Sequence, residues 1–175
     1  MLQTGIPILF VVLSVALRLL PHTWNVAPVV AVGLFCGAYM PKRRALLVSV
    51  AALAVGDLLL GWIPEHLFGW AAVALSVVLG GLLTGRKSVL RIAGTSIAGS
   101  SLFFLLSNFG VWLFGCGKGW YAPDFSGLAA CYAAGIPFYK NGVFGDLLYS
   151  GLLFGSYEFL LRWFHAPSPK AALTR

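Results

Sequence analysis

Six long apolar stretches, separated by short segments that hold prolines and basic residues, run through the sequence. A helix that crosses a membrane needs about 20 consecutive apolar residues, or about 17 when it is upright. The stretches therefore predict six membrane spans in a single domain, 1–175, because no long polar segment divides them. The predicted spans are 5–20, 26–40, 45–62, 67–84, 89–114 and 143–164.

The scarcity of charge excludes the main soluble classes of protein. Only 10% of the 175 residues are charged and 59% are hydrophobic, whereas a soluble domain has about 25% charged residues. So few charges cannot cover a water-facing surface, which excludes a soluble enzyme, a disordered chain and, despite the net charge of +7, a nucleic-acid-binding domain. We expect an all-α integral membrane protein, with the lipid bilayer and not nucleic acid as its partner.

The distribution of Lys and Arg predicts the orientation in the membrane. If the six spans alternate, nine of the 12 basic residues fall on one side, and cytoplasmic segments are the ones that retain Lys and Arg. We therefore expect a multi-pass bundle in the inner (plasma) membrane with both termini in the cytoplasm. The nine residues are Lys42, Arg43, Arg44, Arg86, Lys87, Arg91, Arg162, Lys170 and Arg175.

Small residues recur at helical spacing on two of the predicted spans. Ala45, Ser49, Ala52 and Gly56 lie along the third span, and Gly94, Ala98 and then Gly99-Ser100-Ser101 along the fifth. Small side chains let helix backbones approach closely in lipid, where no hydrophobic effect drives helices together. We expect these faces to pack against other helices of the same bundle.

Four polar residues on four different spans fall at similar depth, toward the outer side: Arg18, Asp57, Asn108 and Asp146. An ionisable side chain within a span costs about 2.5–3.5 kcal/mol on insertion scales and is usually paired or functional. One interpretation is structural: Arg18 pairs with Asp57 or Asp146, and Asn108 bridges helices. In another, the four residues form the floor of a cavity that opens outward and binds a polar solute. A proton-coupled role of the two carboxylates is the third.

The segment 115–142 is predicted to be a long outer loop, rich in aromatic residues. Aromatic residues near a membrane surface are commonly interfacial anchors, but connections longer than about 12–15 residues are usually lids or binding loops. Asp124 predicts a capped short helix over 125–134 that would lie over the mouth of the cavity. The candidate ligand-contacting aromatic residues are Trp112, Trp120, Tyr121 and Tyr149.

No motif in the sequence supports a chemical reaction. Intramembrane hydrolysis needs a nucleophile and a base at depth, yet His22, His66 and His165 all fall outside the predicted spans. There is no phosphate-binding Gly-Lys motif, and no His, Cys, Asp and Glu set at metal-ligand spacing. Cys116 and Cys131 either form a disulfide or remain thiols. We expect no enzyme activity, no cofactor and no metal.

A set of short motifs covers most of the chain between about 15 and 155. They are Arg18-Leu-Leu-Pro21, the Asn25-x-x-Pro28 turn, Gly56-Asp57, Ser107-Asn108-Phe109-Gly110-Val111-Trp112 and Cys131-Tyr132…Pro137-Phe138…Asn141…Gly145-Asp146-Leu-Leu-Tyr149. Together they resemble a family of small six-span bacterial membrane proteins of unknown function.

The six-helix layout, with both ends inside and loops outside, also resembles the substrate-binding S components of energy-coupling-factor vitamin transporters. This resemblance implies a vitamin or similar micronutrient as the solute, and a transmembrane coupling subunit driven by two ATPases as a partner. S components often carry a small-xxx-small motif on the first span. Here that span has Ser14 and Ala16 but no alanine pair four residues apart.

The leading hypothesis from the sequence is a non-enzymatic membrane subunit that binds a small solute for uptake. The alternatives are a structural or scaffold membrane protein, in which the polar cluster only fixes helix register, and a small proton-coupled transporter. The candidate solute-binding residues are Arg18, Asp57, Asn108, Trp112, Trp120, Tyr121, Asp146 and Tyr149.

Overall fold

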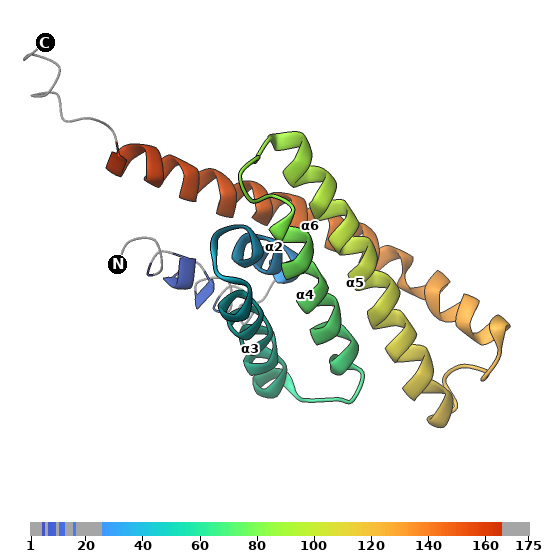
Figure 1. The fold of residues 1–175 in the computed structure, drawn as a ribbon. Coiled ribbons are helices and arrows are strands. Elements are labelled where there is room, and N and C mark those ends of the chain that lie inside the picture. The colour runs from blue at the N-terminus through green and yellow to red at the C-terminus, as the bar shows by residue number, and fades with distance from the viewer. Residues whose placement is uncertain (1–4, 6, 10, 13–15, 17–25, 166–175) are drawn as a thin grey trace, which may run out of the picture.

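The computed structural model describes residues 5, 7–9, 11, 12, 16 and 26–165, and these form helices joined by short connections, without a strand among them (Figure 1). The all-α prediction is confirmed for this part of the chain. The labelled helices are α2 (Val29–Tyr39), α3 (Lys42–Leu60), α4 (His66–Gly81), α5 (Val89–Gly117) and α6 (Phe125–His165).

Each labelled helix overlaps one of the predicted spans. The boundaries follow local signals: the side-chain oxygen of Ser88 accepts a hydrogen bond from the backbone N–H of Arg91 and so caps α5. Within the described residues, α5 is the one helix long and apolar enough to cross a membrane, whereas α2 and α4 are apolar but shorter. The six-span topology itself stays a prediction.

The prediction of a long outer loop over 115–142 is wrong. α5 continues to Gly117 and α6 begins at Phe125, so the connection covers only 118–124. The segment contains Pro137, but a proline removes a hydrogen bond without ending a helix whose other turns are held in place. Here the Tyr139 hydroxyl hydrogen-bonds Ser101 of α5 at 2.9 Å, which holds the turn that contains Pro137.

The start of α6 agrees with the predicted cap. Oδ1 of Asp124 accepts hydrogen bonds from the backbone N–H of Gly127 at 2.9 Å and from the Ser126 hydroxyl at 2.7 Å. The Gly127 bond, followed by the Ser126 bond, lowers the pKa of Asp124. The helix that begins here does not stop near 134, so the predicted short lid helix is the first part of α6.

Helix α2 lies at the centre of the molecule and contacts all four of the other labelled helices (Figure 1). With 11 residues it is about 17 Å long, roughly half the thickness of a bilayer core. Its Leu34, Phe35 and Cys36 are fully buried, and the Phe35 ring packs edge-on against Phe154 and Tyr157 of α6.

Closely approaching backbones hold α2 against α4. Gly33 and Gly37 of α2 form a small-xxx-small pair, and Ser76 and Gly80 of α4 form a second. A Cβ atom added at Gly37 would overlap the carbonyl oxygen of Val77, and one added at Gly80 would overlap the backbone of α2. Only glycine fits at these two positions, because the two backbones are in contact there. This pair was not among the small residues picked out from the sequence.

The small residues that were picked out have two different environments. On α3, Ala45, Ser49 and Gly56 are buried, as expected for a packing face. On α5, Gly94 and Ala98 are exposed, whereas Gly99 and Ser100 are buried. The packing prediction is confirmed for the third span and for Gly99 and Ser100 of the fifth, and it is wrong for Gly94 and Ala98, because α6 covers a different side of α5.

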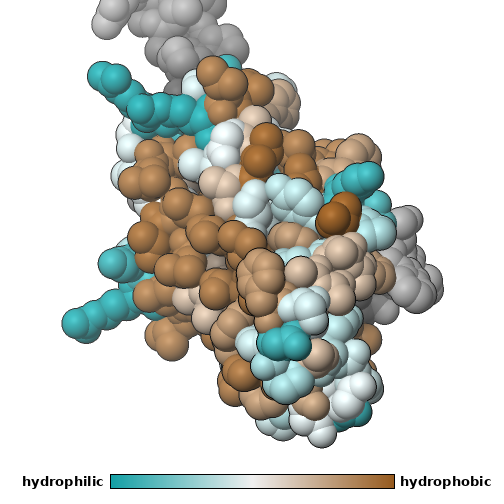
Figure 2. Space-filling view, turned by 90° about the vertical axis from the view of Figure 1, so that its right-hand side faces the viewer, coloured by the Kyte–Doolittle hydropathy of each residue, from teal (hydrophilic) through white to brown (hydrophobic). Residues whose placement is uncertain are grey.

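Apolar residues dominate the exterior and small polar residues lie inside. Leu58, Leu105, Phe144 and Leu152 are among many large apolar side chains that are about half exposed or more. Figure 2 shows one such face, covered largely by apolar side chains with a few hydrophilic ones projecting from it. The buried polar and charged residues are Ser49, Asp57, Glu65, Ser76, Ser96, Ser100, Asp146 and Ser150.

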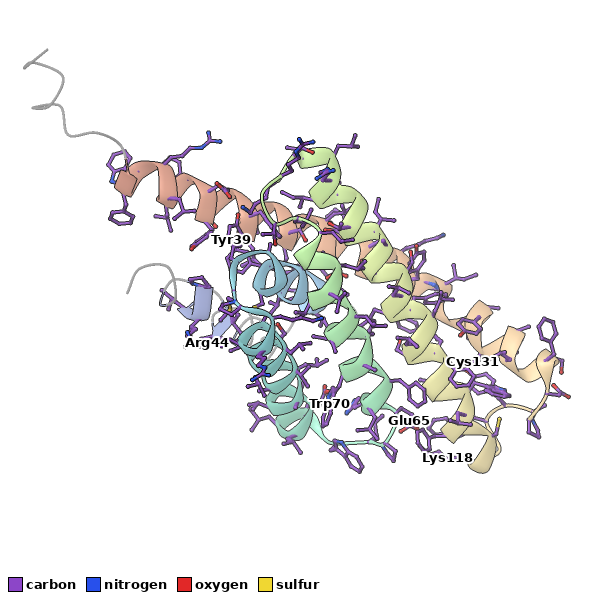
Figure 3. The ribbon with its side chains drawn as sticks, in the orientation of Figure 1. Tyr39, Arg44, Glu65, Trp70, Lys118 and Cys131 are labelled. Carbon is purple, nitrogen blue, oxygen red and sulfur yellow. The ribbon has the colours of Figure 1, made fainter. Side chains whose placement is uncertain are left out.

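Polar clusters mark two opposite ends of the bundle. At one end Lys118 and Glu65 form an ion pair, and Figure 3 shows both far from Tyr39. At the other end the Tyr39 hydroxyl donates a hydrogen bond to Glu158 at 2.6 Å, and Lys87 lies 3.7 Å from the same carboxylate. The connections 61–65 and 118–124 belong to the first end, and 82–88 belongs to the second.

Candidate functional site

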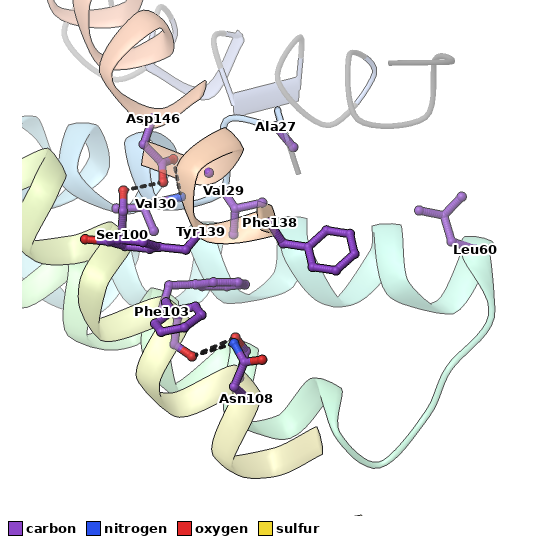
Figure 4. Close-up of a pocket in the computed structure, with 13 residues that line it drawn as sticks. Ala27, Val29, Val30, Leu60, Ser100, Phe103, Asn108, Phe138, Tyr139 and Asp146 are labelled. Atoms are coloured by element: carbon purple, nitrogen blue, oxygen red, sulfur yellow. Dashed lines mark hydrogen bonds between the residues drawn. The ribbon is translucent and has the colours of Figure 1, made fainter. Parts of the chain in front are cut away.

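A cavity of about 270 Å³ lies between α5 and α6, where the first turn of α2 and the last residue of α3 also reach it (Figure 4). One helical face of α5, with residues three or four apart, supplies one wall, and a matching face of α6 supplies the other. The lining residues are Ala27, Val29, Val30, Leu60, Ser100, Phe103, Phe104, Ser107, Asn108, Phe138, Tyr139, Gly142 and Asp146. We call this space the aromatic cavity.

Asp146 lies at the α2 side of the aromatic cavity and is only 4% exposed. Its Oδ1 accepts hydrogen bonds from the backbone N–H groups of Val30 and Ala31, at 3.1 and 3.2 Å. Its Oδ2 accepts a third bond from the Ser100 hydroxyl at 2.7 Å (Figure 4). The carboxylate thereby caps α2, which begins after Pro28 without a side-chain cap of its own. Asp146 joins α2, α5 and α6.

The aromatic side chains of the cavity are held by neighbours of defined geometry. The Tyr139 ring lies 4.8 Å from Phe104 at a tilt of 41°, and its hydroxyl is bonded to Ser101. Phe138 is 38% exposed at the cavity rim. Together with the hydroxyl of Ser107, these groups give the cavity a mostly apolar lining with few polar atoms, which is typical of sites for small organic ligands.

Asn108 also lines the aromatic cavity, and its position depends on the close approach of α5 and α6. Its side-chain amide donates a hydrogen bond to the carbonyl of Phe104, one turn earlier in α5, at 2.9 Å. A Cβ atom at Gly135 of α6 would overlap the Asn108 side chain, so only glycine leaves room for it. The Asn108 carbonyl accepts a hydrogen bond from the thiol of Cys131, and Cys116 and Cys131 are both free thiols.

A second cavity, of about 210 Å³, shares two of its lining residues, Phe103 and Ser107, with the aromatic cavity. We call it the acidic cavity. Asp57, 2% exposed, lines it and accepts a hydrogen bond from the indole N–H of Trp70 at 2.7 Å. The remaining lining residues are Leu53, Ile63, Glu65, His66, Gly69 and Val111.

Glu65 precedes α4 and is 5% exposed. Its Oε1 is 2.5 Å from Nζ of Lys118, the residue after α5, so the pair ties two connections together (Figure 3). Burial raises the pKa of Glu65, but the hydrogen bond and the charge of Lys118 outweigh it, and the pKa lies below its usual value. The carboxyl group is therefore ionised at neutral pH.

The eight residues predicted from the sequence do not form one cluster. Asn108 and Asp146 line the aromatic cavity, and Asp57 lines the acidic cavity beside it. Tyr149 packs against the hydrophobic core, on the same helix as Asp146. Arg18 lies outside the described residues, so its pairing with either carboxylate stays a prediction.

Trp112, Trp120 and Tyr121 lie at the end of α5 and in the connection after it, and none of them lines either cavity. The indole N–H of Trp112 donates to the carbonyl of Ala122 at 3.0 Å. Trp120 is 61% exposed, with Lys118 stacked 4.5 Å from its ring. Tyr121 packs beside Gly115. In this structure the three residues organise the connection 118–124.

The sequence reasoning missed several lining residues, although a signal for them was present. Ser100, Phe103, Phe104, Ser107 and Asn108 follow a spacing of three and four along α5, which places them on one helical face. A face that mixes hydroxyl, amide and aromatic groups within an apolar helix is unusual. Glu65 and His66 were read as a simple loop and gave no comparable signal.

Within the described residues, no group of three or more His, Cys, Asp or Glu side chains is placed to hold a metal ion. The described part of the chain is all-helical and has an apolar exterior. It is built around the short central helix α2, which the buried carboxylate of Asp146 caps. The chain belongs to a family of unknown function, DUF6580, whose model matches residues 1–170. No curated protein and no solved structure matches it.

Proposed function

We propose that this protein is a multi-pass membrane protein that binds a small, partly aromatic solute in the aromatic cavity. The observation that carries the proposal is the cavity itself: about 270 Å³ of space between α5 and α6, walled by Phe103, Phe104, Phe138 and Tyr139. Such a volume accommodates a ligand of one or two rings, and aromatic walls favour stacking with it.

The distribution of residues supports a membrane location. Large apolar side chains cover the outside of α3, α4, α5 and α6, while serines and carboxylates lie within. A soluble domain shows the opposite arrangement, because exposed apolar area in water is unfavourable. Lipid removes that penalty, and it also favours small polar residues between helices.

The basic residues and the helix lengths support the predicted orientation. Lys140 and Arg162 of α6 are about 33 Å apart along the helix axis, close to the thickness of a bilayer core. The part of α6 between them matches the predicted span 143–164, and the turns before Lys140 would extend beyond the outer surface. The aromatic cavity then lies in the outer half of the bundle, where a solute can enter from outside.

In its fuller form the proposal makes the protein a substrate-binding subunit for micronutrient uptake. The resemblance to S components of energy-coupling-factor transporters motivates this form, together with a cavity in the outer half of the bundle. A coupling subunit with ATPases is then the expected partner.

One observation favours a second candidate, a structural membrane protein without a solute. Both carboxylate oxygens of Asp146 are engaged by protein groups, three hydrogen bonds in all. This is what the scaffold hypothesis expects of a polar cluster that only fixes helix register. The two candidates differ in whether the aromatic cavity is occupied when the protein is isolated from its membrane.

Native mass spectrometry of the protein released gently from its membrane tests the proposal. We expect a small-molecule adduct on the wild type, and at least a several-fold smaller adduct fraction on Phe138→Ala, because Phe138 forms the cavity rim. The matched control is Phe144→Ala, which removes the same side chain from the same helix at a site 62% exposed and outside the cavity. An empty wild type would favour the scaffold, and equal adducts on all three proteins would contradict binding in the aromatic cavity.

A further inference from the structure

A further cavity, of about 270 Å³, lies between α5 and α6 at the end of the bundle that carries Lys87. Its walls are mainly apolar, with Val89 on α5 and Leu147 and Phe154 on α6. On α6 the lining extends from Leu147 to Glu158, which is about 17 Å along the helix axis. This length is about half the thickness of a bilayer core, the depth of one leaflet. We call this space the inner cavity.

The inner cavity is open because two of its lining residues are glycines. A Cβ atom added at Gly151 or at Gly155 would meet nothing within 4 Å. The two hydroxyl groups in the lining, those of Ser96 and Ser150, are hydrogen-bonded to each other at 2.8 Å. The space therefore offers apolar contact along α6, and a ligand in it needs few polar groups.

Lys87 places a positive charge at the inner end of this cavity. Its side chain is 22% exposed, and its Nζ lies 4.6 Å from the centre of the Tyr39 ring. Nζ is 3.7 Å from Oε1 of Glu158, which is too long for a hydrogen bond, and that oxygen accepts a hydrogen bond from the Tyr39 hydroxyl. A lysine ammonium group carries several N–H donors. Lys87 therefore keeps donors for an anionic acceptor at the end of the cavity.

Positive charge exceeds negative charge around Lys87. Arg86 precedes it, and Arg91 lies in the first turn of α5. On α6, Arg162 lies one turn after Glu158 on the same face, and Glu158 is the one carboxylate that lines the inner cavity. The sequence predicts that this end faces the cytoplasm, where the leaflet is anionic. Basic pockets between helices on that side are suited to anionic headgroups.

We propose that the inner cavity binds an anionic phospholipid of the inner leaflet, with one acyl chain along α6 and the phosphate at Lys87. The apolar walls and the open positions at Gly151 and Gly155 suit the chain, and the excess of positive charge suits the headgroup. The inference rests on the membrane location in the proposed function, and it adds a lipid site that is separate from the aromatic cavity.

Two phospholipids with the same acyl chains test the headgroup. Native mass spectrometry of the full chain in detergent, titrated with dioleoylphosphatidylglycerol or dioleoylphosphatidylcholine, gives the affinity of the first bound lipid. We expect the wild type to bind the anionic lipid about fivefold more tightly, which is the effect of one lysine near the membrane surface. Lys87→Gln should reduce this preference to less than about twofold.

The control for charge is Lys42→Gln, because Lys42 is exposed at the start of α3 and is not part of the lining. This variant loses the same charge and should keep the preference. A wild type that binds both lipids equally overturns the assignment. So does an equal effect of the two variants, because the attraction would then belong to the net charge and not to the inner cavity.

A second pair of variants tests the acyl chain. Gly155→Leu fills the inner cavity without a clash, and Gly94→Leu adds the same side chain at an exposed position of α5 outside the cavity. We expect Gly155→Leu to weaken binding of dioleoylphosphatidylglycerol about fivefold or more, since several buried methylene groups lose their contacts. Equal affinities of these two variants would overturn the proposal, because a site for free phosphate or for a headgroup alone does not need the cavity.

This proposal and the proposed function fail in different ways. A solute adduct that depends on Phe138, without a lipid preference that depends on Lys87, would keep the solute site and remove the lipid site. A lipid preference that depends on Lys87 and Gly155, without a solute adduct, would keep the lipid site alone.

Discussion

Asp146 and Glu65 are both buried carboxylates beside a cavity, yet the structure uses them differently. Asp146 accepts three hydrogen bonds from α2 and α5, through both of its oxygens. Glu65 uses one oxygen for Lys118, and its other oxygen has no partner among the described residues. The fold therefore uses both oxygens of Asp146 but only one oxygen of Glu65. Burial alone does not show how fully a carboxylate is hydrogen-bonded.

The difference arises from the elements that surround each group. Asp146 faces the start of a helix, whose first N–H groups have no partner of their own. Glu65 itself precedes a helix, and its side chain does not bond to that helix. Helix α2 is therefore expected to depend on Asp146, and α4 is not expected to depend on Glu65.

The largest loss of stability is expected for Asp146→Ala, which removes the carboxylate that caps α2. Two buried N–H groups of α2 would lose their acceptor, whereas the Ser100 hydroxyl could still donate to the carbonyl of Ser96. At about 1–3 kcal/mol for each unsatisfied buried group, partly relieved by water, the free energy of unfolding should fall by about 2–4 kcal/mol. Denaturant unfolding in detergent micelles measures it. Asp146→Asn, which keeps an acceptor oxygen, should lose about 1 kcal/mol, and an equal loss in both variants would contradict the capping role.

The other end of α2 provides the next test. Gly37→Leu places a side chain where the backbone of α4 lies against α2, so we expect a loss of about 3 kcal/mol from overpacking. The matched control is Gly81→Leu, because Gly81 is exposed on α4 and a Cβ atom there meets nothing within 4 Å. Similar stabilities for the two variants, measured by the same unfolding assay, would show that α2 is not held by this contact.

The smallest effect concerns Glu65 and its dependence on pH. Because the folded-state pKa is lowered from 4.5, the ion pair with Lys118 contributes stability above about pH 4.5, and this contribution is lost as the pH falls through the folded pKa. Lys118 is partly exposed, so we expect less than about 1 kcal/mol. Thermal unfolding across this range should show a smaller acid-induced fall in Glu65→Gln than in the wild type. A steeper fall in the variant would reverse the assigned sign.

Much of the helical arrangement is predictable from local sequence. The apolar stretches located α2, α3, α4 and α5 to within a few residues. The first part of α6, up to residue 142, was predicted to belong to a loop, whereas packing against α5 holds the turns around Pro137 in the helix. Local sequence patterns indicate helix propensity, but they do not show which neighbouring helix compensates for a hydrogen bond that a proline removes.

The candidate sites were predictable only in part. Asn108, Asp57 and Asp146 stood out as polar residues within apolar stretches, and each of them lines a cavity. Their grouping into one site did not follow, because Asn108 and Asp146 line a cavity between α5 and α6, whereas Asp57 lines one between α3, α4 and α5. Trp112 and Trp120 were chosen for their residue type, but their contacts belong to the connection 118–124.

By itself the sequence determined that this chain forms apolar helices and carries carboxylates among them, because these properties depend on composition and on spacing along one chain. Only the tertiary structure decided that α2 is a short central helix capped from α6, and that one carboxylate is satisfied while another has an unused oxygen. Hydrogen bonds such as those of Asp146 join residues more than a hundred positions apart. Such pairings depend on which helix faces meet, and that information appears only when the bundle is assembled.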